Sequence, residues 1–105
     1  MKASKSYTSR YQRDKIRNYL ANEAIIIDVR SKNEWKSGHI ESSFHIEMAS
    51  VPYQINMIKA QDKPVIAVCV SGVRSGEIVQ YLLAQGIDAI NGGSWQNVQE
   101  LMQEE

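Results

Sequence analysis

One stretch in the middle of the chain decides the fold. It reads Val65-Ile66-Ala67-Val68-Cys69-Val70-Ser71-Gly72-Val73-Arg74-Ser75-Gly76-Glu77. Its first part is a short apolar run rich in β-branched residues, which predicts a buried strand from Pro64 to Val68. The strand brings Cys69 to its carboxyl end, and a turn of small residues then leads into a helix predicted over residues 77–85. Backbone N–H groups at the start of a helix lack partners and face the inside of such a turn, so the turn is predicted to bind an anion.

Cys69 is the only cysteine in the chain, and two interpretations of it remain open. A lone cysteine after an apolar strand is commonly a packing residue, because free cysteine is among the most buried residue types. Alternatively, the N–H groups and the helix dipole beside it stabilise the ionised thiol and make it a nucleophile. The turn favours the nucleophile, since packing does not require small residues there and Gly72 permits close approach of the backbone to a ligand.

The rest of the chain alternates between helical and strand patterns. Helices are predicted over residues 11–20, 31–37, 52–60 and 95–102, and further strands over 24–27, 44–46 and 87–90. This alternation implies an α/β fold with a doubly wound, mainly parallel sheet of about four to five strands and helices on both faces. In such sheets ligands bind beyond the carboxyl ends of the strands, and Asp28, Arg30 and Cys69 all follow strand ends.

Three details of the pattern are specific enough to test. Ser31 and Glu34 have the spacing of a capping box at the start of a helix. Trp35 and Trp95 are predicted to lie in the core. The segment Asn91-Gly92-Gly93-Ser94 is predicted to be a turn between the last strand and the last helix.

Composition and charge limit the class of protein. The 105 residues are 43% hydrophobic, which predicts a single domain over 1–105 with a loose N-terminal segment at 1–9. Twelve basic residues balance twelve acidic ones, so no net charge attracts nucleic acid or a membrane. The chain shows neither a run of transmembrane length nor the apolar segment of a secretory signal. One cysteine excludes an internal disulfide and a cysteine-rich zinc site, and it favours a reducing, cytoplasmic location.

Four short motifs occur in order along the chain. They are Ile27-Asp28-Val29-Arg30, Gly38-His39-Ile40, Cys69-Val70-Ser71-Gly72-Val73-Arg74-Ser75 and Gly92-Gly93. Together they resemble the rhodanese sulfurtransferase family over nearly the whole chain. The resemblance implies the family's doubly wound fold, with an active-site loop that starts at the cysteine. It also implies transfer of a sulfane sulfur from thiosulfate, mercaptopyruvate or a persulfide to cyanide, a small thiol or a protein thiol, with no metal or organic cofactor.

The resemblance also implies a role for each residue of the loop. Cys69 is the catalytic nucleophile and carries the sulfur as a persulfide, in two half-reactions. Backbone N–H groups of the substrate-binding loop hold the terminal sulfur; the loop consists of Val70, Ser71, Gly72, Val73, Arg74 and Ser75. Arg74 either binds an anionic donor or product, or pairs with a carboxylate such as Asp28 or Glu77. The hydroxyl of Ser71 either donates to the sulfur or only fills a turn position.

Residues outside the loop receive supporting roles. Asp28 and His39 match motif positions whose role is to fix the neighbouring loops by hydrogen bonds. Arg30 is a candidate substrate contact, because a guanidinium matches the geometry of oxyanions. The loop after Cys69 begins with the neutral residues Val70 and Ser71, which resembles mercaptopyruvate-using relatives and counts against efficient use of thiosulfate.

Two other functions remain as alternatives. Cysteine phosphatases and arsenate reductases also combine a thiolate and an arginine in an anion-binding loop, but they place five residues between the two. This chain has four, so its loop is smaller and suits a single sulfur atom better than a phosphoryl group. The second alternative is a non-enzymatic binding or regulatory module, because a fold by itself does not establish an activity.

Overall fold

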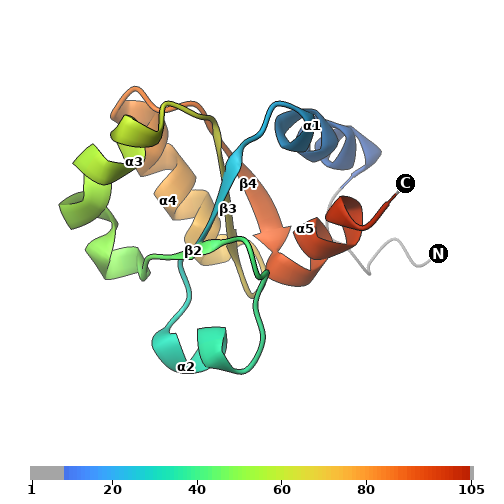
Figure 1. Cartoon of the computed structure of the whole chain (residues 1–105), viewed down its shortest axis with the longest axis horizontal. Coiled ribbons are helices and arrows are strands. Elements are labelled where there is room, and N and C mark those ends of the chain that lie inside the picture. The colour runs from blue at the N-terminus through green and yellow to red at the C-terminus, as the bar shows by residue number, and fades with distance from the viewer. Residues whose placement is uncertain (1–8, 105) are drawn as a thin grey trace.

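The computed structural model describes residues 9–104, in which helices and strands alternate (Figure 1). Residues 1–8, which form most of the segment predicted to be loose, lie outside the described residues. The elements in chain order are α1 (Arg10–Ala21), β1 (Ile25–Asp28), α2 (Lys32–Lys36), β2 (Phe44–His45), the 3-10 helix η2 (Met48–Gln54), α3 (Ile55–Gln61), β3 (Val65–Cys69), α4 (Val73–Ala84), β4 (Ala89–Ser94) and α5 (Trp95–Met102).

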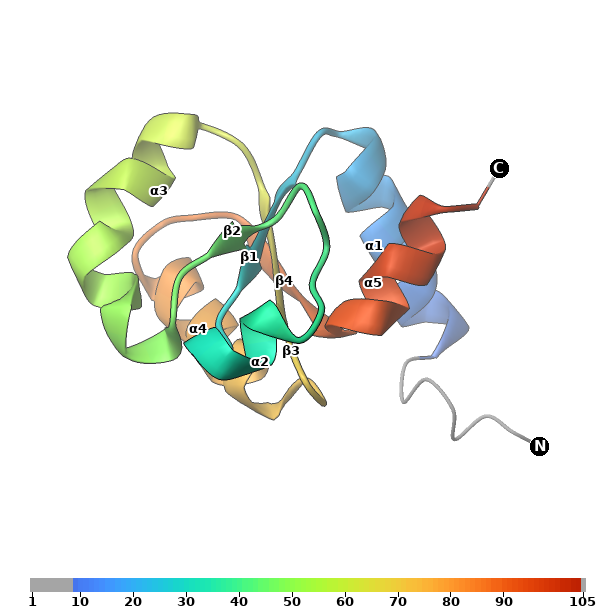
Figure 2. The same ribbon diagram turned by 60° about the horizontal axis from the view of Figure 1, so that its bottom comes forward.

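The strands form a parallel four-stranded sheet in the order β2-β1-β3-β4. Helices α3 and α4 lie on one side of this sheet, and α1 and α5 lie on the other (Figure 1). This arrangement confirms the predicted α/β fold with helices on both faces. The short helix α2 lies beyond the carboxyl ends of the strands, beside the loop that joins β3 to α4 (Figure 2). Within residues 9–104, no helix has both the length and the apolar character needed to cross a bilayer.

Strand β3 is buried along its whole length, as the apolar run predicted. Successive side chains of a strand point to opposite faces, so β3 contributes to two separate cores. Val65, Ala67 and Cys69 pack in the cluster beneath α3 and α4, whereas Ile66 and Val68 pack in the cluster beneath α1 and α5. The alternation therefore points the Cys69 side chain towards α4.

The start of α4 differs from the sequence-based prediction. The helix begins at Val73 rather than Glu77, because Gly72 adopts a φ of +103° and turns the chain directly from the strand into the helix. Residues with a side chain rarely adopt that conformation. The loop between Cys69 and the helix is consequently only three residues long.

The predicted turn at residues 91–94 is wrong, because these residues belong to β4. The pairing of β4 with β3 shifts register between Ala67 and Val68, and a glycine in a strand often marks such an irregularity. At Gly92 there is no room for a side chain: a Cβ atom would lie 2.6 Å from Val98 and 2.7 Å from Ile66. The glycine therefore permits close packing of the strand, which a sequence pattern cannot distinguish from a turn.

The two tryptophans differ in their surroundings. Trp95 packs against the core beneath α1 and α5, as predicted. Trp35 was predicted to lie in the core, but it belongs to neither core cluster. Its ring stacks on His39, with 3.6 Å between ring centroids, and on His45, at 4.9 Å. Because α2 is short and lies beyond the strand ends, its tryptophan packs on these two rings rather than in the core.

Candidate active site

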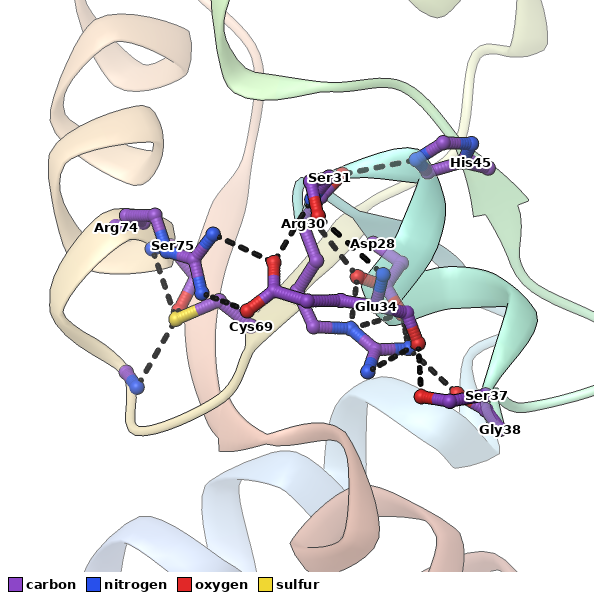
Figure 3. A network of polar contacts seen from close by, with 11 residues as sticks. Asp28, Arg30, Ser31, Glu34, Ser37, Gly38, His45, Cys69, Arg74 and Ser75 are labelled. Atoms are coloured by element: carbon purple, nitrogen blue, oxygen red, sulfur yellow. Dashed lines mark hydrogen bonds and ion pairs between the residues drawn. The ribbon is translucent and has the colours of Figure 1, made fainter.

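Cys69 is the last residue of β3, and its side chain is 1% exposed. The Sγ atom lies 3.0 Å from the backbone nitrogen of Gly72 and 3.4 Å from that of Ser75. The Ser75 hydroxyl lies 3.3 Å from the same sulfur (Figure 3). The sulfur therefore faces two N–H donors and a hydroxyl group. Cys69 is thus both buried, as a packing residue would be, and surrounded by polar groups, as a nucleophile would be.

These groups have opposing effects on the acidity of the thiol. Burial by itself would raise the pKa of Cys69, because it penalises the charged form. Hydrogen bonds from the Ser75 hydroxyl and from the amides of Ser75, Gly72 and Ser71 outweigh burial, so the pKa of the thiol is lowered. Cys69 is thus a buried thiol whose charged form is solvated by the protein.

The Cys69 loop, residues 69–75, is shaped by Gly72. A Cβ atom at this position would lie 3.2 Å from the Cα atom of Gly93 in β4, in addition to the strain of the positive φ. The loop is thereby held against β4. Val70 and Val73 point outwards and are 50% and 69% exposed, so the loop presents two apolar side chains at its rim.

The hydroxyl group beside the sulfur belongs to Ser75 and not to Ser71. Ser71 is exposed, which leaves its predicted hydroxyl contact without support from the geometry. Ser75 is buried in the first turn of α4, and its hydroxyl also donates to Oδ1 of Asn91. Sequence reasoning missed Asn91, because an asparagine before two glycines is typical of a turn.

Arg74 forms an ion pair, but with a different partner from either predicted carboxylate. Its guanidinium binds both carboxylate oxygens of Glu34 in α2, at 2.9 and 3.1 Å (Figure 3). The hydrogen bonds from Arg74, and then the backbone N–H of Ser31, lower the pKa of Glu34 to about 2. Glu34 therefore serves two purposes, since it completes the predicted capping box of α2 and balances the charge of Arg74. The sequence identified the first role only.

Asp28 and Arg30 form a buried ion pair behind this network, with side chains 0% and 3% exposed. The Arg30 guanidinium binds both Asp28 oxygens and also donates to the carbonyl oxygens of Glu34 and Gly38. Arg30 was predicted as a candidate substrate contact, but its donors are occupied by protein groups and its charge is buried. Arg30, held by Asp28, instead connects α2 to the segment that follows it through its hydrogen bonds to these carbonyl oxygens.

The histidines lie beside α2 rather than at the sulfur. Nδ1 of His39 lies 2.8 Å from the carbonyl oxygen of Trp35, and Nε2 of His45 lies 2.8 Å from that of Arg30. His39 thus contacts the backbone of α2, and its supporting role stays a prediction. Within the described part of the chain, no group of three or more His, Cys, Asp or Glu side chains is placed to hold a metal ion.

Comparisons with known proteins agree with this geometry. The family model described as "Rhodanese-like domain" matches residues 12–101. The chain is 32% identical over 76 residues to the thiosulfate sulfurtransferase GlpE of Shewanella oneidensis, covering 70% of this chain and 74% of GlpE. It is 35% identical over 69 residues to YtwF of Bacillus subtilis, covering 66% of each chain. A crystal structure of a rhodanese-like domain protein from Staphylococcus aureus superposes with a TM-score of 0.68 at 33% identity, covering 82% of this chain and 85% of that one.

Proposed function

This chain belongs to the family of rhodanese-like domains, and from that premise we propose that it is a sulfurtransferase that carries one sulfur atom on Cys69. The observation that supports this most is the set of donors around Sγ: the N–H groups of Gly72 and Ser75 lie within hydrogen-bond distance of a single sulfur. Such donors stabilise a thiolate before the reaction and need no rearrangement when charge develops. Similarity to the thiosulfate sulfurtransferase GlpE supports the same class of reaction.

In the first half-reaction the Cys69 thiolate attacks the outer, sulfane sulfur of the donor. A sulfur–sulfur bond forms on Cys69, and the bond between the sulfane sulfur and the rest of the donor breaks. With thiosulfate as donor, the electron pair of the broken bond leaves with sulfite, and Cys69 becomes a persulfide anion. With mercaptopyruvate the thiolate attacks the thiol sulfur instead, the carbon–sulfur bond breaks, and its electron pair leaves as the enolate of pyruvate, which takes up the thiol proton. Neither case requires oxidation by a third molecule, so the step needs no metal or organic cofactor.

In the second half-reaction a thiophilic acceptor attacks the terminal sulfur of the persulfide. Cyanide would leave as thiocyanate, and a thiolate would leave as its own persulfide, with the Cys69 thiolate restored in both cases. The chain contains no second cysteine, so the acceptor must be another molecule, either small or a protein thiol. Two half-reactions through a covalent intermediate predict ping-pong kinetics.

The rim of the loop bears on the choice of donor. Val70 and Val73 are exposed and apolar, and the charge of Arg74 is balanced by Glu34. A doubly charged donor such as thiosulfate therefore finds no free cation in the Cys69 loop itself. This favours mercaptopyruvate or an organic persulfide over thiosulfate, in agreement with the neutral loop sequence.

Intact mass spectrometry combined with a thiocyanate assay tests the proposal. The protein is incubated with thiosulfate, mercaptopyruvate or an alkyl persulfide, and its mass should increase by one sulfur atom that cyanide removes as thiocyanate. Cys69→Ser, checked for its fold by circular dichroism, should neither gain the sulfur nor form thiocyanate. Turnover that survives in this variant would contradict the proposal.

These assays, together with a test of aryl phosphate hydrolysis, separate the two alternatives. Hydrolysis of an aryl phosphate that depends on Cys69, without sulfur loading, would identify phosphatase chemistry. A folded protein that accepts sulfur from none of these donors would instead support a non-enzymatic binding module. Each result excludes the proposed sulfur transfer with these donors.

A further inference from the structure

The side chain of Asn91, on β4, contacts the Cys69 loop at its middle, Gly72, and at its last residue, Ser75. Its Nδ2 donates to the carbonyl oxygen of Gly72 at 2.8 Å. Its Oδ1 accepts from the hydroxyl of Ser75 at 2.7 Å and from the N–H of Gly93 at 2.9 Å. Neither the sequence motifs nor the two half-reactions assign Asn91 a role, although it contacts the residues that solvate the sulfur.

The orientation of this amide is fixed by its backbone partners. The carbonyl of Gly72 can only accept a hydrogen bond and the N–H of Gly93 can only donate one, so nitrogen faces the first and oxygen faces the second. The Ser75 hydroxyl lies against the oxygen, which can only accept. Ser75 is therefore the donor in its hydrogen bond with Asn91.

A serine hydroxyl has a single proton, and this limits what Ser75 can do for the sulfur. While its proton points to Asn91, the oxygen of Ser75 can only accept, so at 3.3 Å the thiol S–H of Cys69 donates to it. When Cys69 ionises, the hydroxyl proton is free to turn from Asn91 to the thiolate. Oδ1 of Asn91 keeps the N–H of Gly93 as a donor, so the turn leaves no buried acceptor without a partner.

We propose that Asn91 is a positioning residue that holds the Ser75 hydroxyl proton while Cys69 is a neutral thiol and releases it when the sulfur becomes charged. Its bond to the Gly72 carbonyl holds the middle of the loop, so that the Gly72 N–H stays directed at Sγ. The catalytic meaning of this role rests on the proposed sulfur transfer, but the proton switch itself does not. Asn91 thus competes with the sulfur for one hydroxyl proton.

The charged groups around the sulfur are the same in all of the test variants. Arg74 comes from α4 and interacts with the charges of Cys69 and Asp28, while Glu34 of α2 pairs with Arg74. Asp28 is paired in turn with the buried Arg30. Replacing Ser75 or Asn91 by an uncharged residue therefore changes hydrogen bonding at the sulfur and adds no charge.

A double-mutant cycle on the rate of alkylation tests the proposal. Iodoacetamide reacts with the thiolate, so its rate at a pH well below the pKa reports how well the protein stabilises the charged sulfur. The rate is measured across pH for the wild-type protein, Ser75→Ala, Asn91→Ala and the double variant. We expect Ser75→Ala to slow alkylation both in the wild-type protein and in Asn91→Ala. The factor should be roughly threefold larger in Asn91→Ala, because without Asn91 the Ser75 hydroxyl donates to the sulfur without competition.

The sign of this coupling separates the proton switch from a purely structural role. If Asn91 only braces the loop, its removal lets Ser75 drift from the sulfur, and Ser75→Ala has an equal or smaller effect in the Asn91→Ala background. Either of those results overturns the proposal. Asn91→Val, which also lacks hydrogen-bonding atoms and suits a strand, provides the same cycle if the alanine variant fails to fold.

A matched control comes from the neighbouring helix. The Asn97 side chain donates to the carbonyl oxygen of Gly92 in the same strand. In the Asn97→Ala background, Ser75→Ala should slow alkylation by the same factor as in the wild-type protein. Because alkylation requires no sulfur donor, the cycle remains decisive even if the protein transfers no sulfur, and the thiocyanate assay fails or succeeds independently of it.

Discussion

Helices α2 and α4 each follow a strand of the same sheet, but the N–H groups of their first turns find hydrogen-bond partners in two different ways. In α2 the N–H of Glu34, the third helical residue, is bound by the hydroxyl of Ser31, and the Glu34 carboxylate binds the N–H of Ser31. In α4 the corresponding N–H, that of Ser75, is directed at Sγ of Cys69 instead. Gly72 precedes this helix and has no side chain to offer.

The other serine-capped helices strengthen the contrast. The N–H of the third residue binds a serine oxygen at the start of α1 and of α5 as well, from Ser9 and Ser94 respectively. At α4 a cysteine three residues before the glycine takes the place of that oxygen. Because Gly72 provides no capping side chain, the N–H groups of Gly72 and Ser75 at the start of α4 are directed at the Cys69 sulfur.

Removing the buried charge behind α2 should have the largest effect on stability. Arg30→Ala leaves Asp28 buried without its partner, and loss of one member of a buried ion pair typically costs about 3–5 kcal/mol. Chemical denaturation should show this decrease in the free energy of unfolding. Arg17→Ala, which removes two exposed ion pairs, with Asp14 and with Glu104, is the control and should change stability little.

Gly72→Val should displace one of the N–H donors at the start of α4. The valine would have to adopt a φ of +103° with its Cβ 3.2 Å from the Cα of Gly93, so the Gly72 N–H would be displaced from Sγ. Loss of one such donor typically lowers turnover by roughly a hundredfold or more. We expect that loss in the thiocyanate assay, with the far-ultraviolet circular dichroism spectrum largely retained.

A second glycine provides the control for Gly72→Val. Gly86, just beyond the other end of α4, also has a positive φ, but no atom lies within 4 Å of a Cβ built there. Gly86→Ala therefore tests backbone strain without disturbing the Cys69 loop, and it should retain turnover. Equal losses in the two variants would show that general strain, and not the placement of the Gly72 N–H, limits the reaction.

Ser31→Ala should remove the serine cap of α2 and leave the start of α4 unchanged. Loss of a serine cap usually costs about 1 kcal/mol of stability. The free energy of unfolding should fall by that amount, while the alkylation rate of Cys69 stays the same, because the Ser31 hydroxyl does not contact the sulfur. An altered pH profile of Cys69 in this variant would mean that the two helix starts are coupled.

The smallest effect is expected in the acidity of Cys69, because burial opposes its hydrogen bonds. Burial raises the pKa of the thiol. Hydrogen bonds from the Ser75 hydroxyl and from the amides of Ser75, Gly72 and Ser71 lower it by more than burial raises it, so the net pKa is below the ordinary value. The rate of alkylation should therefore rise with pH at lower values than for a free thiol. The linked contribution to stability is present above the pKa of the unfolded thiol and is lost as the pH falls through the lowered, folded pKa. A profile at or above the ordinary thiol pKa would contradict this.

The parts of the molecule that depend on local pattern were predictable. The apolar run of β3 located the strand and placed Cys69 at its end, and the spacing of Ser31 and Glu34 identified the cap of α2. The alternation of strand and helix patterns indicated the parallel sheet, and the resemblance to rhodaneses implied the same fold and a role for the loop.

The parts that depend on partners distant in sequence were not predictable. Glu34 and Arg74 are 40 residues apart, so no local spacing links them, and the sequence offered other carboxylates such as Asp28 and Glu77. The guanidinium of Arg30 donates to the carbonyl oxygens of Glu34 and Gly38, and these contacts become visible only in the folded structure. Asn91 was hidden because its hydrogen bonds reach across to a neighbouring element.

The role of the Cys69 sulfur as the cap of α4 provides a spectroscopic probe. The amide hydrogens of Gly72 and Ser75 both point at this atom, so their proton and nitrogen chemical shifts depend on the charge that it carries. In a nitrogen-15 correlation spectrum these two resonances should follow ionisation, and loading with a further sulfur, in real time. They would report the charge and the sulfur loading of Cys69 without a reagent that reacts with the thiol.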